Sequence, residues 1–159
     1  MTNTTTKQRI ALGSDHAGYA VKESIKKYLE TAGYAVDDQG TGSAETSVDY
    51  PDFAKAVGER VVAKKNDLGI VVCGTGIGIS IAANKVPGIR AALAHDVMTA
   101  KLAREHNDAN VLALGGRVVS DAVAVELVQT FLNTAFAGGR HQQRVEKIAA
   151  LEAEEKNKS

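Results

Sequence analysis

The sequence predicts an α/β protein of the three-layer α/β/α type, with a five-stranded parallel Rossmann-like sheet and an extra C-terminal helix. Apolar runs of strand length alternate five times with segments of helical periodicity, a pattern typical of a parallel sheet covered by helices on both faces. The uncharged stretch 68–84 gives the strongest signal, because a β-branched run breaks into a glycine-rich loop and resumes as a helix. No internal repeat and no linker interrupts residues 9–152, so we expect a single domain.

The first half of the chain contains two strand–helix units and the third strand. Short apolar runs predict strands at 9–13, 34–37 and 68–72. Apolar residues at helical spacing predict a helix from 17 to 32, with Gly33 at its C-terminal end. A second helix is expected at Pro51, because the fixed φ of proline suits the first helical position. The polar segment 39–48, rich in Gly, Ser and Thr, is expected to be a loop.

The second half continues the alternation. Helices are expected from 77 to 83, from 97 to about 106 and after Ser120, and strands at 89–93 and 111–114. Asp96 and Ser120 are the predicted N-caps of their helices. The last helix begins near Arg140, and its narrow apolar stripe suits packing on a partner subunit or on the chain's own body. Residues 1–8 predict a disordered tail and residues 153–159 a frayed polar tail.

The composition limits the class of protein. The 19 basic and 19 acidic residues cancel, which argues against binding to nucleic acid or a membrane surface. Aromatic residues make up only 4% of the chain and tryptophan is absent, so stacking platforms for bases are not expected. One cysteine excludes an internal disulfide and fits a reducing cytoplasm. The N-terminus lacks an apolar signal segment, and 68–83 is too short and glycine-rich to span a membrane.

Polar residues follow several of the predicted strands and helices. The carboxyl ends of parallel strands meet at one edge of the sheet, where ligands bind in open α/β folds. We therefore expect a site that gathers these residues at that edge. The candidates are Asp15 and His16 after the first strand, Cys73 and Thr75 after the third, His106 and Asn107 after the fourth helix, Arg117 after the fifth strand, and Arg140, His141 and Arg144 in the last helix.

Cys73 is the most informative of these candidates. It lies where the third strand meets the loop Gly74-Thr75-Gly76-Ile77-Gly78, and both the loop amides and the start of the next helix favour a thiolate there. A thiolate can act as a base or as a nucleophile. Arg140 and Arg144 lie four residues apart on one helical face, which suggests that they bind a phosphate or a carboxylate.

Each candidate also has a purely structural explanation. A lone cysteine is often a small buried hydrophobe, and a glycine loop can be a plain strand-to-helix turn. Asp15 suits a helix N-cap, and His106 suits a helix C-terminus, where a cation is favoured. The two arginines fit a solvated helix face, and His95-Asp96 is interpreted as a cap only.

Several common motifs are absent from the sequence. The loop does not match a dinucleotide-binding fingerprint, because Ile79 occupies the position of the last glycine. No phosphate-binding loop of the G-x-x-x-x-G-K-[ST] type is present. The spacing of His and Cys residues gives no argument for a metal site.

Five longer motifs resemble those of a known family. They are GSDHAG at 13–18, DYPDFA at 49–54, CGTGIGISIAANK at 73–85, REHNDANVLALGGR at 104–117 and GGRHQQRVEKI at 138–148. Together they resemble the sugar-phosphate isomerase family that includes ribose-5-phosphate isomerase of type B and the galactose-6-phosphate and allose-6-phosphate isomerases. The resemblance implies interconversion of an aldose phosphate and a ketose phosphate without a metal or organic cofactor. It also implies a homodimer, or a dimer of dimers, with active sites at the subunit interface.

The resemblance further implies a role for each candidate. Cys73 corresponds to the base that forms a cis-enediolate, and Ile77 occupies the position where serine-containing relatives have a glutamate base. His106 corresponds to the ring-opening acid and base, with Thr75 assisting. Substrate contacts correspond to Asp15, His16, Gly74, Thr75, Gly76, Ile77, Gly78, Asn107, Arg117, Arg140 and Arg144.

The expected substrate pair is ribose 5-phosphate and ribulose 5-phosphate, a step of the non-oxidative pentose phosphate pathway. Allose or galactose 6-phosphate, or a tetrose phosphate, is the alternative, because Tyr50, His16 and Met98 could line the pocket and cannot be sized from sequence. A non-catalytic sugar-phosphate-binding module is the alternative from a different class.

Overall fold

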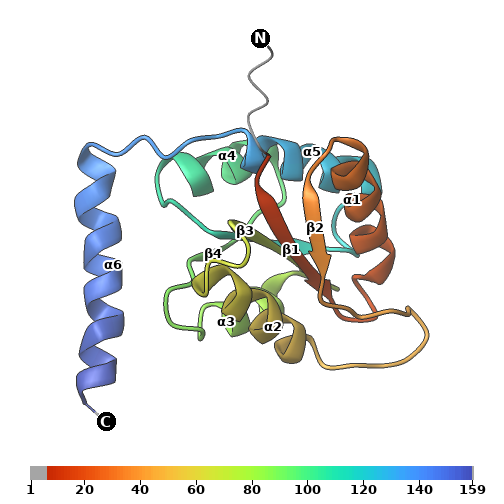
Figure 1. Ribbon diagram of the computed structural model, residues 1–159, viewed down its shortest axis with the longest axis horizontal. Helices are drawn as coiled ribbons and strands as arrows, with labels where there is room; N and C mark the ends of the chain where they lie inside the picture. Colours follow the sequence, from red (N-terminus) through yellow and green to blue (C-terminus); the bar gives the residue numbers. More distant parts are fainter. Residues whose placement is uncertain (1–6, 159) are drawn as a thin grey trace.

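The computed structural model describes residues 7–158 and confirms the predicted fold class (Figure 1). A single sheet of five parallel strands has the order β2-β1-β3-β5-β4. The strands are β1 (Arg9–Ser14), β2 (Ala35–Asp38), β3 (Leu68–Cys73), β4 (Ala91–Leu93) and β5 (Val111–Gly115). The helices are α1 (Tyr19–Thr31), α2 (Tyr50–Val62), α3 (Ile77–Ala83), α4 (Val97–Glu105), α5 (Asp121–Leu132) and α6 (Arg140–Asn157).

The helices form two layers around the sheet (Figure 1). One face packs on α1, α4 and α5 through a core that includes Leu12, Ile25 and Phe131. The other face packs on α2 and α3 through a core that includes Val57, Val71 and Ile79. Because β3 is buried on both faces, its run of β-branched residues is what a central parallel strand requires.

The strand order reverses direction between β1 and β3, which lie side by side with Ser14 opposite Val72. From this pair the chain builds outward to β2 on one side and to β5 and β4 on the other. The N–H of Asp15 donates to the carbonyl of Val72 at 3.2 Å, so the first residue after β1 is bonded to β3. In open α/β sheets such a switch point leaves a crevice at the carboxyl edge where ligands bind.

Most predicted boundaries agree with the structure to within a residue or two. The N-caps Asp96 and Ser120 are confirmed, since their side chains accept from Thr99 N at 2.7 Å and Val123 N at 3.2 Å. Strand β4 is shorter than the predicted 89–93, because Ile89 closes the preceding turn through a hydrogen bond to the carbonyl of Val86. Pro51 is the second residue of α2 and not the first.

The edge strand β4 has a side-chain partner on its outer side. Asn84, the residue that follows α3, donates its amide N–H to the carbonyl of Ala91 at 3.0 Å. Its amide oxygen accepts from the N–H of Ala91 at 2.8 Å. The two hydrogen bonds occupy the outward-facing polar groups of Ala91.

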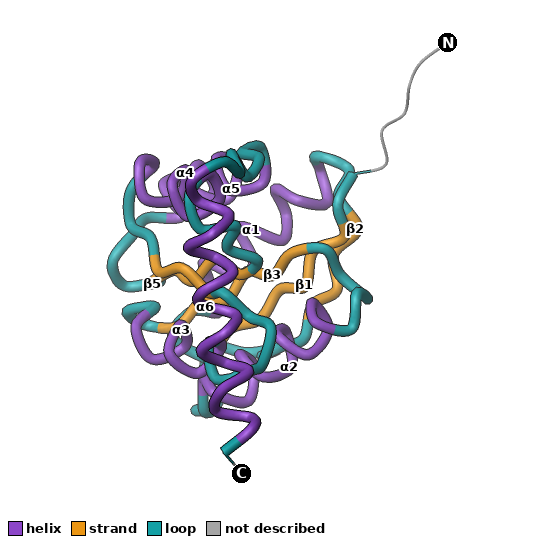
Figure 2. The backbone as a smooth tube through the Cα atoms, turned by 90° about the vertical axis from the view of Figure 1, so that its left-hand side faces the viewer, coloured by secondary structure: helices purple, strands orange, loops and turns teal. Residues whose placement is uncertain are grey.

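Helix α6 stands beside the body and crosses in front of it when the molecule is turned by 90° (Figures 1 and 2). Of its residues within the described part of the chain, only Val145 is buried, whereas Ile148 and Leu151 are 45% and 63% exposed. The N–H of Gly88 donates to the Glu152 carboxylate at 3.0 Å. A groove of about 890 Å³ separates α6 from the edge of β4, with apolar walls that include Ile89, Ala91 and Leu151.

The two tails predicted from the sequence differ in outcome. Residues 1–6 and 159 lie outside the described residues, and Lys7 bonds to the carbonyl of Ala32. The stretch predicted to be frayed is helical as far as Asn157, which corrects that expectation. Glu and Lys are good helix formers, and the pair between Glu155 and Lys158 at 3.4 Å supports the last turn.

A buried ion pair fastens the loop that follows β2. Lys22 is 1% exposed and donates to the two carboxylate oxygens of Asp38 at 2.8 and 2.9 Å and to the carbonyl of Thr41 at 2.8 Å. Thr41 N–H in turn donates to the carbonyl of Ser14 at 2.9 Å. The ion pair therefore holds the loop against the end of β1, one residue before Asp15.

Asp38→Asn is expected to lower the free energy of unfolding at pH 7 by about 3 kcal/mol, because it removes the closer carboxylate from the buried Lys22 and leaves only the exposed Glu23 at 3.4 Å. Burial raises the pKa of the Asp38 carboxyl, but the hydrogen bonds from Lys22, Gly40 N–H and Lys26 outweigh it, so the pKa lies below its ordinary value of 3.8. The carboxylate therefore contributes to stability above pH about 4, and the contribution is lost as the pH falls through the lowered pKa.

Urea unfolding at a series of pH values checks this expectation. The difference between wild type and Asp38→Asn is expected to shrink below pH about 4. Glu59→Gln is the matched control, since its pair with Lys55 is 60–71% exposed and its loss costs no more than about 0.5 kcal/mol. An Asp38→Asn difference that stays constant from pH 7 to pH 3 would contradict the assignment.

Candidate active site

The reactive candidate Cys73 is the last residue of β3 and is 4% exposed. Its Sγ accepts a hydrogen bond from the N–H of Gly76 at 3.2 Å. The bond forms because Gly76 adopts φ +79° and turns the loop back over the sulfur. The loop therefore directs a backbone donor at the sulfur.

Thr75 and Gly78 complete the loop around Cys73. The Thr75 side chain is exposed, and its Oγ1 accepts from the N–H of Ile77 at 3.2 Å. Tyr50 at the start of α2 packs its ring over Gly78, where an added Cβ would lie only 2.5 Å from the ring. Tyr50 is therefore placed beside the loop, as a pocket-lining residue would be, whereas Met98 is 64% exposed at the start of α4.

Asp15 and His16 lie beside this loop, at the end of β1. Asp15 is 6% exposed, and its Oδ1 accepts from the N–H of Gly18 at 2.9 Å, so it caps the first turn before α1. His16 Nδ1 accepts from the N–H of Val48 at 3.2 Å. In a neutral imidazole the proton then resides on Nε2, which leaves a donor on the other side of the ring.

Arg117 belongs to the same group of residues. Its backbone N–H donates to the carbonyl of Gly74 at 2.9 Å, and Gly116 N–H donates to the carbonyl of Cys73 at 2.8 Å. A Cβ added to Gly74 would lie 3.2 Å from Nη1 of Arg117, so the guanidinium lies directly over the loop backbone. The structure thus brings together a carboxyl-edge cluster that consists of Asp15, His16, Cys73, Thr75 and Arg117.

The remaining candidates form a second group, the amino-edge cluster, made of His106, Asn107, Arg140, His141 and Arg144. The imidazoles of His106 and His141 are stacked, with ring centroids 4.1 Å apart and an interplanar angle of 15°. Burial lowers the pKa of His141 below its ordinary value of 6.5, and the neighbouring His106 and the two arginines lower it further. The sequence offered His141 together with the two arginines but gave it no role, because its stacking on His106 is a tertiary contact.

Within one chain the two clusters lie at opposite edges of the sheet. Helix α4 connects two parallel strands, so it returns from the carboxyl edge to the amino edge, and His106 at its end lies before the start of β5. Cys73 pairs with Gly115 at the far end of β5. The strand between them spans about 13 Å at a rise of about 3.3 Å per residue. The expectation that one chain gathers all candidates at one edge is therefore wrong.

Among residues 7–158, no group of three or more His, Cys, Asp or Glu side chains is placed to hold a metal ion. Over the same part of the chain, no helix combines the length and the apolar character needed to span a membrane.

Comparison with known proteins identifies the family. The profile described as Ribose/Galactose Isomerase matches residues 10–148. Ribose-5-phosphate isomerase B of Escherichia coli (strain K12) is 48% identical over 145 residues, which cover 91% of this chain and 97% of that protein. By sequence and fold the chain belongs to the Ribose/Galactose Isomerase family of enzymes.

Solved structures show which members of the family this chain resembles. Ribose-5-phosphate isomerase B of Clostridium thermocellum superimposes with a TM-score of 0.90 at 54% identity, covering 92% of this chain and 98% of that chain. The enzyme of the same name from Mycoplasma genitalium, solved with bound ribulose-5-phosphate, gives a TM-score of 0.88 at 45% identity, covering 92% and 97%. The type B ribose-5-phosphate isomerases are thus the particular relatives that this chain resembles.

Proposed function

We propose that this protein is a cofactor-independent aldose–ketose isomerase that interconverts ribose 5-phosphate and ribulose 5-phosphate, and that it acts in the cytoplasm. The observation that carries the proposal is the Cys73 sulfur at the sheet's switch point, with the Gly76 N–H directed at it. The substrate pair is supported by relatives named ribose-5-phosphate isomerase B, one of them solved with bound ribulose-5-phosphate.

The first step is opening of the furanose ring. His106 donates a proton to the ring oxygen and takes up the proton of the anomeric hydroxyl, and imidazole suits both transfers near neutral pH. Thr75, whose hydroxyl is exposed beside the reactive loop, orients the oxygen that becomes the carbonyl. The product is the open-chain aldehyde with its C2 proton facing Cys73.

The second step moves hydrogen between adjacent carbons. The Cys73 thiolate takes the proton from C2, the electron pair forms the C1–C2 double bond, and the carbonyl oxygen becomes negative, which gives a cis-enediolate. Backbone N–H groups of the loop 74–78 stabilise that oxygen, since fixed donors are most effective where charge develops. Cys73 then returns the proton to C1, while the proton of the C2 hydroxyl passes to the negative C1 oxygen, which leaves the C1 hydroxyl and the C2 carbonyl of the ketose.

The phosphate takes no part in these bond changes but places the sugar. Arg140 and Arg144 are exposed on one face of α6, a geometry that suits a dianion, and Arg117, His16 and Asn107 supply further donors. The Asp15 carboxylate accepts from sugar hydroxyls. Binding energy at the remote phosphate is used to hold C2 at the base.

The proposed chemistry needs a second copy of the chain. Cys73 and His106 lie at opposite edges within one chain, so a complete site combines the carboxyl-edge cluster of one copy with the amino-edge cluster of another. Ile77 and Ile81 lie beside the reactive loop on α3 and are 52% and 56% exposed. The apolar groove between α6 and β4 offers a surface that such side chains would fill. We therefore propose a homodimer, or a dimer of dimers, with two-fold symmetric interfaces.

A panel of sugar phosphates tests the proposed reaction. Purified protein is expected to convert ribose 5-phosphate to ribulose 5-phosphate without added metal or cofactor, and more efficiently than allose 6-phosphate, galactose 6-phosphate or erythrose 4-phosphate. In deuterated water, NMR is expected to show deuterium at C1 of the ketose. Binding without conversion or exchange would establish the non-catalytic module instead, and a higher kcat/KM for another sugar would replace the substrate.

Mixing two inactive variants tests the shared site. Cys73→Ala and His106→Ala are each expected to be inactive as homodimers. Unfolding and refolding them together at equal amounts makes half of the dimers mixed, each with one intact site, so activity is expected to return to about a quarter of wild type. Refolded single variants are the controls. A mixture that stays inactive while mixed dimers are detected would show that both residues serve one chain's own site.

A further inference from the structure

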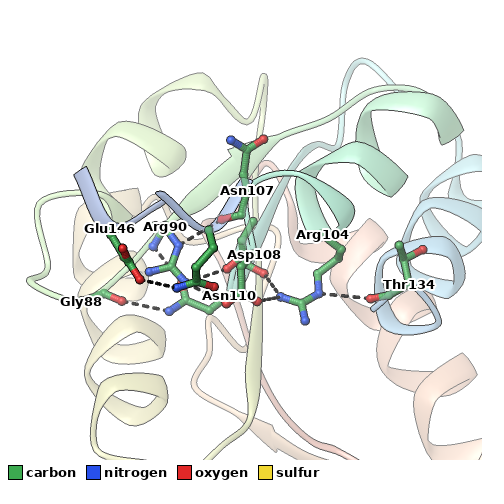
Figure 3. Close-up of polar contacts among 10 residues, drawn as sticks. Gly88, Arg90, Arg104, Asn107, Asp108, Asn110, Thr134 and Glu146 are labelled. Carbon is green, nitrogen blue, oxygen red and sulfur yellow. Dashed lines mark hydrogen bonds and ion pairs between the residues drawn. The ribbon is translucent and has the colours of Figure 1, made fainter. Parts of the chain in front are cut away.

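Arg90, the residue before β4, is bonded to the turn that carries His106 and Asn107 (Figure 3). Its Nε donates to the carbonyl of Asn107 at 3.1 Å, and its Nη2 donates to the carbonyl of Asp108 at 2.8 Å. Its backbone is fastened as well, since its N–H donates to Asn110 Oδ1 at 2.8 Å and its carbonyl accepts from Asn110 N at 3.0 Å. One guanidinium thus holds the two carbonyls that directly follow the histidine.

The turn needs this support because of its backbone conformation. Asp108 has φ +45°, a region that residues other than glycine rarely adopt. Its carboxylate lies between two guanidiniums, at 3.0 Å from Arg104 Nη1 and 3.4 Å from Arg90 Nη2. The backbone is bonded too, with Asp108 N–H donating to the carbonyl of Arg104 at 3.1 Å.

The two arginines have different surroundings. Arg104 is 13% exposed and faces inward, with contacts to the carbonyl of Ala109 and the ring of Phe131, so it belongs to the core. Arg90 is 26% exposed and lines the groove beside α6 together with Asn107. In Figure 3 the carbonyl of Asn107 faces Arg90 while its amide side chain points away, so the guanidinium orients the residue without occupying its donor.

We propose that Arg90 is a positioning residue for ring opening: by holding the carbonyls of Asn107 and Asp108, it sets where His106 and Asn107 meet the substrate in the neighbouring copy's site. The proposal rests on the function proposed above. Among residues 7–158, the other contacts that fix His106 are its backbone hydrogen bond to Leu102 and its stack on His141. A displacement of about 1 Å in such a group costs up to about 100-fold in rate.

The test separates ring opening from proton transfer. Ribose 5-phosphate is cyclic, whereas ribulose 5-phosphate cannot close a five-membered ring because its O5 carries the phosphate. Conversion of the aldose therefore needs both His106 and Cys73, while exchange of the ketose C1 hydrogen with deuterated water needs only Cys73. Arg90→Lys keeps the charge but not the planar fork. At saturating substrate it is expected to lower aldose conversion about 10- to 100-fold and ketose exchange less than about twofold.

Arg60→Lys is the matched control. Arg60 is 30% exposed and donates to Asn66 at 2.8 Å, but it contacts neither cluster, so both of its rates are expected to stay at wild-type values. If Arg90→Lys lowers both rates equally, or lowers neither, Arg90 has no positioning role. Arg90→Met repeats the test, and failure of both variants to fold would show that the arginine serves the fold itself. A wild-type protein that neither isomerises nor exchanges would instead refute the proposed function.

Discussion

Cys73→Ala is expected to lower turnover of ribose 5-phosphate by about 10³-fold or more, because Cys73 is the group proposed to take the C2 proton. General acid–base catalysis alone accounts for about 10²- to 10⁴-fold in enzymes. In this chain the sulfur is buried at the end of β3 with one loop N–H directed at it, and alanine leaves that N–H without an acceptor. The measurement is kcat for aldose conversion at pH 7.5.

Binding of the substrate is expected to survive the same change. The phosphate contacts are assigned to arginines on another element, so the Kd of ribose 5-phosphate measured by calorimetry is expected to change less than about threefold. Cys73→Ser is the matched control, because a hydroxyl fills the space and accepts the Gly76 N–H but does not ionise near neutral pH. Turnover close to wild type in Cys73→Ala would end the assignment of the base.

Gly76→Ala is expected to lower the free energy of unfolding by about 2–5 kcal/mol. The left-handed backbone costs a residue with a Cβ about 1–2 kcal/mol, and overpacking adds about 1–3 kcal/mol. Gly76 has φ +79°, and an added Cβ would lie 2.5 Å from Leu93 Cδ1 and 2.8 Å from the backbone carbon of Leu114. Urea unfolding monitored by circular dichroism measures the loss.

Two other glycines separate the causes of that loss. Gly138 has φ +65° with nothing within 4 Å of an added Cβ, so Gly138→Ala is expected to cost only the backbone share, about 1–2 kcal/mol. Gly42 has neither the positive φ nor a close neighbour, and its change to alanine is expected to stay within about 0.5 kcal/mol. Equal losses for Gly76→Ala and Gly138→Ala would show that close packing under the loop is unimportant.

The fold could be predicted because local patterns determine it. The β-branched run in β3, the N-caps Asp96 and Ser120, and the glycine loop each act over a few residues, and the alternation of strands and helices leaves few topologies. The helical extension to Asn157 was missed because polar composition was taken as fraying, although Glu and Lys favour helices. Strand order is set by contacts between segments far apart and gave no local signal.

The site was only half predictable, for a geometric reason. Residues that directly follow strands, such as Asp15, Cys73 and Arg117, were correctly placed together, because parallel strands share a carboxyl edge. His106 follows a helix, and a crossover helix returns the chain to the other edge. The motif that contains it identifies the family but not the direction in which the residue faces. Arg90 gave no signal and His141 was a candidate without a role, since carbonyl binding and ring stacking depend on tertiary contacts.

The amide of Asn84 has a consequence for how these molecules coexist in concentrated solution. An extended segment of another molecule that paired with β4 as a sixth strand would need free N–H and C=O groups along the outer edge of β4. At Ala91 both are already engaged by one side chain, so the template for runaway intermolecular β-pairing is blunted there. Replacing Asn84 with leucine would therefore free both polar groups of Ala91 and favour intermolecular β-pairing at this edge.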